Sequence, residues 1–429
     1  MRGSLLSEGG VDHLIDDGRL AELLDDVIEA GIPEGARKVL LIPPDHTRLY
    51  SGAGKITAYL YSKLGDRMVV DVMPALGTHV PMSKEEIVLM FGSSIPFSAF
   101  LPHRWRDDLE VLGEVPSSFI EEVSEGAVSY SMEVAVNQQL TQGNYDAIFS
   151  IGQVVPHEVI GMANYTKNIL IGVGGGDSIH KSHFLGAAYG MERIMGRTDT
   201  PVRRVLDKAY DEHVAHLPIT FLLTVMEKSE DDVLMRGFFA GKDRSCFEAG
   251  AKLSQQVNFD LLEEPIQKAV VYLDPREFKT TWLGNKAIYR LRMAMADEGE
   301  LIILAPELHG FGEDEEIDGL IRKYGYHGTP KTLEAVGKNQ DLKDNLSAAA
   351  HLIHGSSEGR FSITYCPGEG VTQEEIEGVG FKYQPYAEVA KTYDPEKLKD
   401  GWQELNGERI FYVSNPALGL WALRGQFQH

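Results

Sequence analysis

Apolar runs of strand length alternate along this chain with longer stretches of helical spacing. The short runs include 38–42 (KVLLI), 68–74 (MVVDVMP), 146–151 and 168–173 (NILIGV), all interpreted here as strands, and residues 55–64 have helical spacing. A further helix is expected to begin at Ser83, because Ser83 and Glu86 have the spacing of a capping box. This alternation is typical of an α/β fold around a mostly parallel sheet.

The same alternation restarts after Glu264. Strands are predicted at 269–275 (AVVYLDP), 300–310 (ELIILAPELHG) and 408–416 (ERIFYVSNP), and helical character at 279–296 and 332–353. We therefore expect two α/β domains with mostly parallel sheets, 1–262 and 263–410, with the active site in the cleft between them. The tail from about 411 to 429 is expected to pack back on the first domain.

Composition narrows the class of protein. The chain has 429 residues, of which 43% are hydrophobic and 24% charged, and a formal net charge of −23, which argues against a nucleic-acid partner. The apolar runs are far shorter than a membrane-spanning helix, and the N-terminus lacks the apolar core of a secretory signal, so a cytoplasmic location is expected. Cys246 and Cys366 are expected to be ordinary thiols.

Polar side chains with acid–base or anion-binding chemistry follow several of the predicted strands. These are Asp45 and Arg48 after the first strand, His79 after the second, His157, and the glycine run 174–176. Each one alone is more often structural: a turn with a helix cap and a surface ion pair, or a satisfied histidine. Their convergence at strand ends of one sheet instead favours a site. Two histidines on opposite faces of a carbon suit a racemase or epimerase.

Lys167 and His183 lie in the same part of the chain as these groups. A lysine amine can hold a cofactor covalently, although a lysine at a strand start is more often solvated. The glycine run could approach a phosphate, but it has neither P-loop spacing nor the dinucleotide pattern GxGxxG, which argues against a nicotinamide dehydrogenase. His180 and His183 have only loosely the spacing of metal ligands.

Taken together, DHTR at 45–48, GTH at 77–79, PHE at 156–158, YTK at 165–167 and His183 resemble the nickel-dependent lactate racemase family, and the resemblance extends to Lys286 in TTWLGNK. Members of that family use a nickel-pincer nucleotide, a pyridinium-3-thioamide-5-thiocarboxylate mononucleotide. It is tethered to a lysine, and its nickel is held by the pincer and one histidine.

This resemblance implies a role for each matching position. The implied roles are Lys167 as the tether, His183 as the nickel ligand, His79 and His157 as acid/base residues supported by Asp45, Arg48 and Lys286 as binders of the substrate carboxylate, and Thr47, Gly174, Gly175 and Gly176 as cofactor contacts. The implied reaction removes the hydroxyl proton of a 2-hydroxy acid and transfers the α-hydride to the pyridinium. The keto acid is then reduced from its other face.

The substrate and two other functions remain open at this stage. Lactate-specific members have a glutamine where this chain has Trp282 or Leu283, so the resemblance implies lactate or a longer 2-hydroxy acid such as a sugar acid. Glu307 and His309 either contact extra hydroxyls or form a turn. The alternatives are a zinc-dependent hydrolase or lyase using Asp45, His79, His157 and His183, and a nonenzymatic nickel- or nucleotide-binding protein. Cofactor-synthesis enzymes are the expected loading partners.

Overall fold

The structure is a computed structural model that describes residues 5–228, 232–417 and 419–426. Its contacts divide the chain into two compact units. Unit 1 runs to Leu185 and resumes from Arg193 to Asn258, and unit 2 comprises Gly186–Glu192 and the chain from Phe259 onward. The chain thus passes to unit 2 just before the boundary expected near residue 262.

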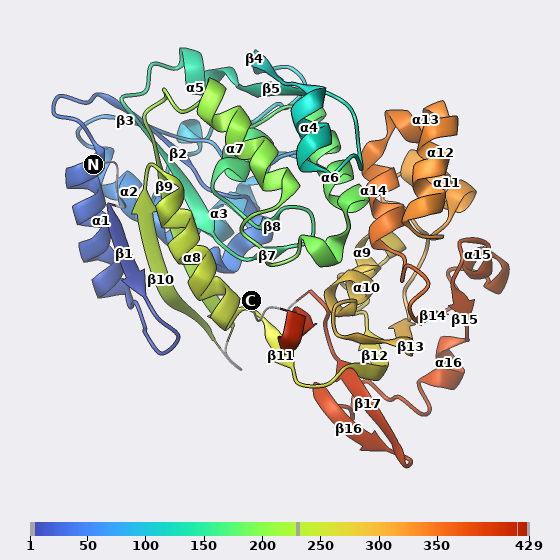
Figure 1. Cartoon of the computed structure of the whole chain (residues 1–429). Coiled ribbons are helices and arrows are strands. Elements are labelled where there is room, and N and C mark those ends of the chain that lie inside the picture. The colour runs from blue at the N-terminus through green and yellow to red at the C-terminus, as the bar shows by residue number, and fades with distance from the viewer. Residues whose placement is uncertain (1–4, 229–231, 418, 427–429) are drawn as a thin grey trace. The chain divides into compact units, whose positions relative to one another are not determined.

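Unit 1 is built on a six-stranded sheet with the order β1-β10-β9-β6-β2-β3 (Figure 1). Strand pairs β2–β3, β2–β6 and β6–β9 are parallel, whereas β10 pairs antiparallel with both β9 and β1. The strands are β1 (Leu6–Gly9), β2 (Lys38–Ile42), β3 (Val69–Val72), β6 (Ala147–Gln153), β9 (Ile219–Lys228) and β10 (Val233–Gly241). Two antiparallel pairs lie outside it: β4 (Leu109–Val115) with β5 (Met132–Asn137), and β7 (Pro156–His157) with β8 (Gly161–Met162).

Helices connect these strands. They are α1 (Asp17–Gly31), α2 (Ala53–Leu64), α3 (Lys84–Phe91), α4 (Ser117–Val123), α5 (Gln138–Gln142), α6 (Gly176–Tyr189), α7 (Pro201–His213) and α8 (Arg244–Val257). The short helical segments are η1 (His46–Ser51), η2 (Phe97–Ala99), η3 (Asn168–Gly172) and η4 (Met191–Arg193). Helix α6 begins in unit 1, and its residues from Gly186 onward belong to unit 2.

The central strands of unit 1 are apolar along their whole length because both of their faces are covered. Every residue of β2 after Lys38 is buried, and so is β6 from Ala147 to Gly152. Leucines of α1 and α2, among them Leu23 and Leu60, pack in one core with side chains of these strands, while α8 packs against β9 and β10. Parallel strands buried on both sides have this composition.

Unit 2 contains a second six-stranded sheet, with the order β15-β14-β13-β12-β17-β16. Its pairs are parallel except for the antiparallel pair β16–β17. The strands are β12 (Ile266–Tyr272), β13 (Met295–Ala305), β14 (Ser362–Pro367), β15 (Lys382–Tyr383), β16 (Gly401–Leu405) and β17 (Glu408–Val413), with the separate parallel pair β11 (Asp260–Leu262) and β18 (Trp421–Leu423). The α/β class with mostly parallel sheets is confirmed.

The helices of unit 2 are short. They are α9 (Thr281–Gly284), α10 (Lys286–Leu291), α11 (Glu315–Tyr324), α12 (Thr329–Lys338), α13 (Gln340–Asp344), α14 (Leu346–His354), α15 (Gln373–Gly378), α16 (Tyr386–Val389) and the 3-10 turn η5 (Arg424–Gln426). Two expected continuous helical stretches are therefore divided. Residues 279–296 form α9 and α10 and then enter β13, and 332–353 is covered by α12, α13 and α14.

Several predicted elements are confirmed, and the strand predicted at 168–173 is wrong. The strands expected at 38–42, 68–74 and 146–151 are β2, β3 and β6, and Ser83 caps α3 in a full capping box with Glu86. Residues 168–172 instead form η3, one turn of π-helix in which Ile169, Leu170 and Ile171 are buried. A short apolar run has the same pattern in a buried strand and in a buried helical turn.

The C-terminal tail also differs from the expectation. Strand β17, which ends at Val413, pairs in parallel with β12 of the unit 2 sheet, and β18 pairs with β11 of the same unit. The apolar side chains of β17 belong to the core of unit 2, with Ile410 and Tyr412 fully buried there. The prediction that the tail packs on the first domain is therefore wrong. No helix among the described residues has the length and apolar character needed to cross a membrane.

Candidate active site

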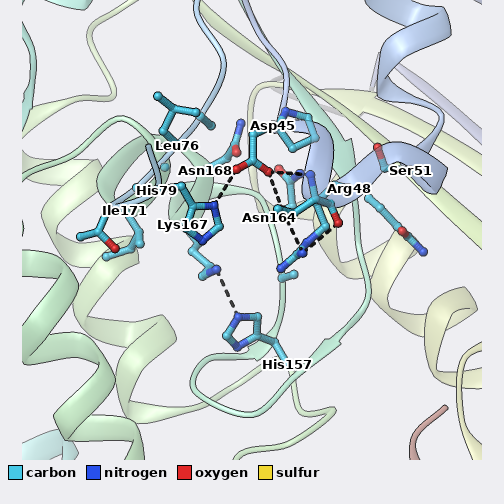
Figure 2. Close-up of a pocket in the computed structure, with 18 of the residues that line it drawn as sticks. Asp45, Arg48, Ser51, Leu76, His79, His157, Asn164, Lys167, Asn168 and Ile171 are labelled. Carbon is cyan, nitrogen blue, oxygen red and sulfur yellow. Dashed lines mark hydrogen bonds and ion pairs between the residues drawn. The ribbon is translucent and has the colours of Figure 1, made fainter. Parts of the chain in front are cut away.

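A pocket lies at the carboxyl edge of three neighbouring parallel strands of unit 1. Segments that follow β2, β3 and β6 line it together with the loop before η3 and the middle of α6, around a cavity of about 230 Å³ (Figure 2). The lining residues are Pro44, Asp45, Thr47, Arg48, Ser51, Ala75, Leu76, Gly77, Thr78, His79, Gln153, Val155, His157, Ala163, Asn164, Lys167, Asn168, Ile171, Gly172, Ile179 and His183. Strand ends of an open α/β sheet are where ligands commonly bind.

Asp45 holds two elements of the pocket at once. Its Oδ1 caps η1 by accepting from the Thr47 backbone at 3.2 Å and from the Thr47 hydroxyl, and its Oδ2 lies 2.6 Å from Nδ1 of His79. Burial alone raises the pKa of Asp45, but the hydrogen bonds from His79 and Thr47 outweigh it, so this pKa lies below its ordinary value. An ionised Asp45 accepts the Nδ1 proton of His79, which leaves Nε2 of that ring as a proton acceptor.

His157 and Lys167 lie in contact in the same pocket, 3.3 Å apart between Nε2 and Nζ (Figure 2). Nδ1 of His157 accepts the backbone N–H of Val159 at 3.1 Å, so we infer that a neutral ring carries its proton on Nε2. The carboxylate of Glu158 is 3.8 Å from Nδ1, too far for a hydrogen bond. Nε2–H then donates to the amine of Lys167, and the pair is complete only when that amine is neutral.

Burial lowers the pKa values of the basic groups in the pocket and so favours their uncharged forms. It lowers the pKa of Lys167 to about 8, with a further contribution from the charge of Arg48. Burial followed by the charge of Lys167 holds the pKa of His157 well below its ordinary value and lowers the pKa of His183 to about 4. A larger fraction of the Lys167 amine is therefore neutral, and so nucleophilic, than in an ordinary lysine. Both imidazoles are neutral near pH 7.

His183 has the hydrogen-bonding pattern of a metal-binding imidazole. It lies on α6, and its Nδ1 donates to the carbonyl of Ile179 one turn earlier at 2.6 Å. This bond fixes the proton on Nδ1 and leaves the lone pair of Nε2 for a ligand. A metal binds histidine only in its neutral form, with a free ring nitrogen, and His183 has this form.

Arg48 gives the pocket a cation that is not neutralised within it. Its guanidinium donates to the Thr47 carbonyl at 3.1 Å, and no carboxylate pairs with it among the described residues. Asp45 is the only lining residue with a carboxylate, whereas Arg48 and Lys167 both have basic side chains. A small anion therefore finds positive charge here even though the chain as a whole has a net charge of −23.

Asn168 is a lining residue that the sequence did not single out. Its amide donates to the carbonyl of Ile42 at 3.2 Å and to the hydroxyl of Ser150 at 2.9 Å, which ties η3 to the ends of β2 and β6. Asn164, another lining residue, has a left-handed backbone with φ of 67°. A π-helical turn and a left-handed loop next to Lys167 are features often found at functional sites.

Gly174 and Gly175 lie between η3 and α6, Gly176 begins α6, and none of the three is among the lining residues. A Cβ on Gly174 would lie 1.8 Å from the carbonyl oxygen of Leu170, and one on Gly176 would lie 2.8 Å from the Trp105 ring. Close packing explains glycine at these two positions. The cofactor contact predicted for Gly174, Gly175 and Gly176 stays a prediction.

The remaining predicted residues lie in unit 2, apart from the pocket lining. Lys286 is the first residue of α10 and is half-buried, with Nζ 5.7 Å from the centre of the Phe278 ring. Trp282 packs on the ring of His351 at 4.3 Å between centroids. Glu307 and His309 pair with each other at 3.4 Å in the turn after β13. The substrate roles of Lys286, Glu307 and His309 stay predictions.

Metal ligands and thiols give two further results. No group of three or more histidine, cysteine, aspartate or glutamate side chains suited to hold a metal occurs in the described part of the chain. The pincer cofactor that the resemblance implies would need an amine and one imidazole with an available Nε2, and Lys167 and His183 line the cavity with groups of these two kinds. Cys246 and Cys366 are buried free thiols whose pKa burial raises to about 12, as expected of ordinary thiols.

The chain is similar to known proteins in one segment of its sequence and in its fold. Residues 20–193 match the family model of the lactate racemase N-terminal domain. A solved structure of a protein from Thermotoga maritima has a TM-score of 0.78 at 23% identity and covers 97% of this chain and 100% of its own. The lactate racemase apoprotein from Thermoanaerobacterium thermosaccharolyticum has a TM-score of 0.66 at 15% identity, covering 94% of this chain and 92% of its own. A search of curated proteins finds no match.

The matched segment contains the pocket groups Asp45, His79, His157, Lys167 and His183. The two structural matches have low identity and show a shared fold over nearly the whole chain. The resemblance found in the sequence is thereby confirmed: residues 20–193 match the model of the lactate racemase N-terminal domain.

Proposed function

We propose that this protein is a racemase or epimerase that inverts the α-carbon of a 2-hydroxy acid, with a nickel-pincer nucleotide tethered to Lys167. The observation that carries the proposal is that one cavity combines the amine of Lys167, the available Nε2 of His183, the Asp45–His79 pair, His157 and Arg48. A racemase needs proton-transfer groups and an anion clamp around one carbon. The family of residues 20–193 supports the same reaction class.

In this proposal the cofactor is held by Lys167 through a thioamide and by His183 through Nε2. When bound, it supplies a hydride acceptor that takes and returns the hydrogen of the α-carbon. Thr47, Gly174, Gly175 and Gly176 are proposed as its other contacts, of which Thr47 lines the pocket. Loading requires cofactor-synthesis enzymes, and a cytoplasmic location remains part of the proposal.

The substrate is bound and its proton moved by side chains of this chain. Arg48, which has no carboxylate partner among the described residues, binds the substrate carboxylate, and Lys286 of unit 2 is proposed as a second binder. Nε2 of His79 takes the hydroxyl proton while Asp45 stabilises the imidazolium that forms. His157 takes the hydroxyl proton of the opposite enantiomer. Lactate and a longer acid such as a sugar acid are both candidate substrates, since recognition of the carboxylate and hydroxyl leaves the rest of the molecule unspecified.

The first experiment compares the intact mass and nickel content of protein produced together with cofactor-synthesis enzymes. The wild type is expected to gain the mass of the nucleotide and to hold nickel in equal proportion. Lys167→Arg is expected to lose the covalent increment because a guanidinium does not form the thioamide. Lys208→Arg is the matched control, since Lys208 forms an ion pair with Glu212 on the outside of α7.

Activity is then measured as stereochemical inversion of a panel of 2-hydroxy acids in deuterated water. Hydride transfer predicts inversion without incorporation of solvent deuterium at the α-carbon. His79→Ala and His157→Ala are expected to keep the nucleotide mass and lose turnover, which separates an enzyme from a protein that only stores nickel or nucleotide. Absence of both mass increment and nickel in the wild type, despite a competent host, would refute the proposal.

A further inference from the structure

Arg203 is a fully buried arginine whose guanidinium bonds to the segment that precedes Lys167. It lies on α7, is 0% exposed and donates to the Thr166 hydroxyl at 2.8 Å, the Met162 carbonyl at 2.6 Å and the Asn164 carbonyl at 3.1 Å. A buried guanidinium is strongly unfavourable without such partners. Three acceptors within one short loop mean that the loop and the arginine hold each other in place.

Asp207 completes this connection from the next turn of α7. Its Oδ1 accepts from the Thr166 hydroxyl at 2.7 Å and lies 3.8 Å from the Arg203 guanidinium, while its Oδ2 accepts from Arg244. The Thr166 hydroxyl thus accepts from Arg203 and donates to Asp207. Burial lowers the pKa of Arg203 to about 10, against the opposing charge of Asp207, so the arginine remains charged at neutral pH.

The loop held in this way has an unfavourable backbone. Asn164 and Tyr165 are consecutive left-handed residues, with φ of 67° and 59°, and neither is glycine. Such conformations persist only where the surroundings enforce them. The buried Tyr165 ring, stacked on Phe247 at 5.4 Å between centroids, and the Arg203 bonds on either side provide that restraint.

Two groups of the pocket depend on this loop. Lys167 follows Thr166 directly and precedes η3. Met162, whose carbonyl Arg203 binds, pairs across the β7–β8 ladder with Pro156, next to His157. The arginine therefore bonds to the segment of chain that joins His157 to Lys167.

We propose that Arg203, with Asp207 and Thr166, is a positioning residue that fixes the loop 162–166 so that Lys167 and His157 meet in the pocket. The assignment rests on the proposed function in taking Lys167 as the attachment point. Arg203, Asp207 and Thr166 lie outside the pocket lining and act through Lys167 and His157.

The test measures the position of Lys167 in the full chain made without cofactor-synthesis enzymes. Competitive acetylation with acetic anhydride is followed across pH by mass spectrometry of the Lys167 peptide, with Lys208 as the internal reference. Thr166→Val breaks the bonds of the hydroxyl and leaves the charge of Arg203 in place. Arg203→Met removes the guanidinium, and Arg204→Met is the matched control, since Arg204 is its exposed neighbour and pairs with Asp199 at 2.7 Å.

The wild type is expected to have a labelling midpoint for Lys167 near its pKa of about 8. In Thr166→Val and Arg203→Met the amine leaves its buried contact, and the midpoint moves upward by about one unit or more toward the ordinary lysine value of roughly 10.4. Arg204→Met keeps the wild-type midpoint. A shift in Arg203→Met alone would point to lost charge, whereas the shift in Thr166→Val reports the lost bond. Unchanged midpoints in both variants would overturn the proposal.

Three further cases keep the test decisive. If Arg203→Met fails to fold, Thr166→Val and Asp207→Asn take its place, because the first removes both bonds of the hydroxyl, the second removes the charge of the carboxylate, and both keep the arginine. If the midpoint shifts as expected but the wild type never gains the nucleotide mass, the positioning role stands and the cofactor proposal fails. If all variants acquire the nucleotide equally and their midpoints do not move, the positioning role fails and the cofactor proposal stands.

Discussion

The two imidazoles proposed as acid and base have opposite hydrogen bonds at Nδ1. Nδ1 of His79 donates to Asp45, whereas Nδ1 of His157 accepts from the backbone of Val159. The first ring therefore presents an acceptor at Nε2 and the second a donor. A racemase can use such a pair, because one ring removes a proton on one face of the substrate and the other ring donates a proton on the opposite face.

Asp45→Asn tests this assignment at His79. An asparagine still caps η1, so the fold is expected to remain, but an amide has one acceptor oxygen for the two tasks of the carboxylate. Its N–H₂ group facing Nδ1 moves the ring proton to Nε2 and removes the base. We expect kcat to fall by about 10²–10⁴-fold with little change in KM.

The control for this variant is Asp17→Asn, an 81% exposed carboxylate paired with Lys55 on the surface. Racemisation kinetics and a urea unfolding curve are measured for both proteins. Equal kcat values for Asp45→Asn and the wild type would contradict the role of Asp45.

Residues at the ends of apolar strands were predictable from the sequence, because strand ends converge at one edge of a parallel sheet. Asp45, His79 and His157 were identified in this way, and all three line the pocket. Arg203 was not, since an arginine in a helix is ordinarily solvated and nothing local indicates that it is buried. Its role depends on a loop about forty residues earlier, and sequence pattern does not report contacts over that distance.

At the scale of elements, the run 168–173 is predicted as a strand, but its residues 168–172 form η3. Its apolar residues are buried on all sides, so neither a period of two nor one of 3.6 is visible in six positions. The turn is instead determined by tertiary bonds: Gly77 donates its backbone N–H to the carbonyl of Gly172 at 2.8 Å, and Asn168 bonds to two strands. The strands β2, β3 and β6 have four to seven residues, so length does not distinguish them from this turn; the strand prediction is right for them because each pairs with a neighbouring strand of the sheet.

A neutral histidine holds the beginning of α6 in place. Nε2 of His103, which is 2% exposed, donates to the Gly174 carbonyl at 3.1 Å, and its Nδ1 accepts from the Asn137 amide at 3.1 Å. Burial lowers the pKa of His103 to about 4. Protonation of Nδ1 would eliminate the acceptor for Asn137, so acid is expected to weaken the connection between β5 and α6.

The pH dependence of stability tests this connection. Between pH 6.5 and 4 the unfolded chain binds the His103 proton and the folded chain does not, so stability falls as pH falls through this window. The His103 contribution is expected to decrease by about 2 kcal/mol from pH 7 to pH 5. His103→Gln should flatten the measured slope of unfolding free energy against pH by that amount, and the exposed His216→Gln should not. Identical slopes for His103→Gln and the wild type would exclude the effect.

At the scale of the whole molecule, the segment Gly186–Glu192 joins unit 2 while the chain on either side of it belongs to unit 1. Arg292, 2% exposed, anchors this segment by bonding Glu192 at 2.5 and 3.2 Å and the Ser356 carbonyl at 3.1 Å. The anchor is therefore an ion pair between a buried arginine and a partly buried glutamate from distant parts of the sequence.

Arg292→Met leaves Glu192 without its main partner and is expected to lower the free energy of unfolding by about 3–5 kcal/mol. Arg276→Met, whose 87% exposed arginine pairs with Asp274, is expected to change it by less than about 1 kcal/mol. Combining Arg292→Met with Glu192→Gln should recover part of the loss, because no buried charge is then left unpaired. Urea titration of the wild type, Arg292→Met, Glu192→Gln, the double variant and Arg276→Met checks this, and a loss in the double variant equal to the sum of the two single losses would contradict the pairing.

Helix α6 continues from unit 1 into unit 2 without interruption, and this links the two parts of the helix. His183 lies on the unit 1 part, and the residues from Gly186 onward, less than one turn later, belong to unit 2. Successive residues of a helix keep a fixed orientation to one another, so a ligand on the imidazole of His183 is coupled to helix residues that belong to the other unit. By linkage, the free energy with which such a ligand favours one arrangement of α6 equals the free energy with which that arrangement favours the ligand.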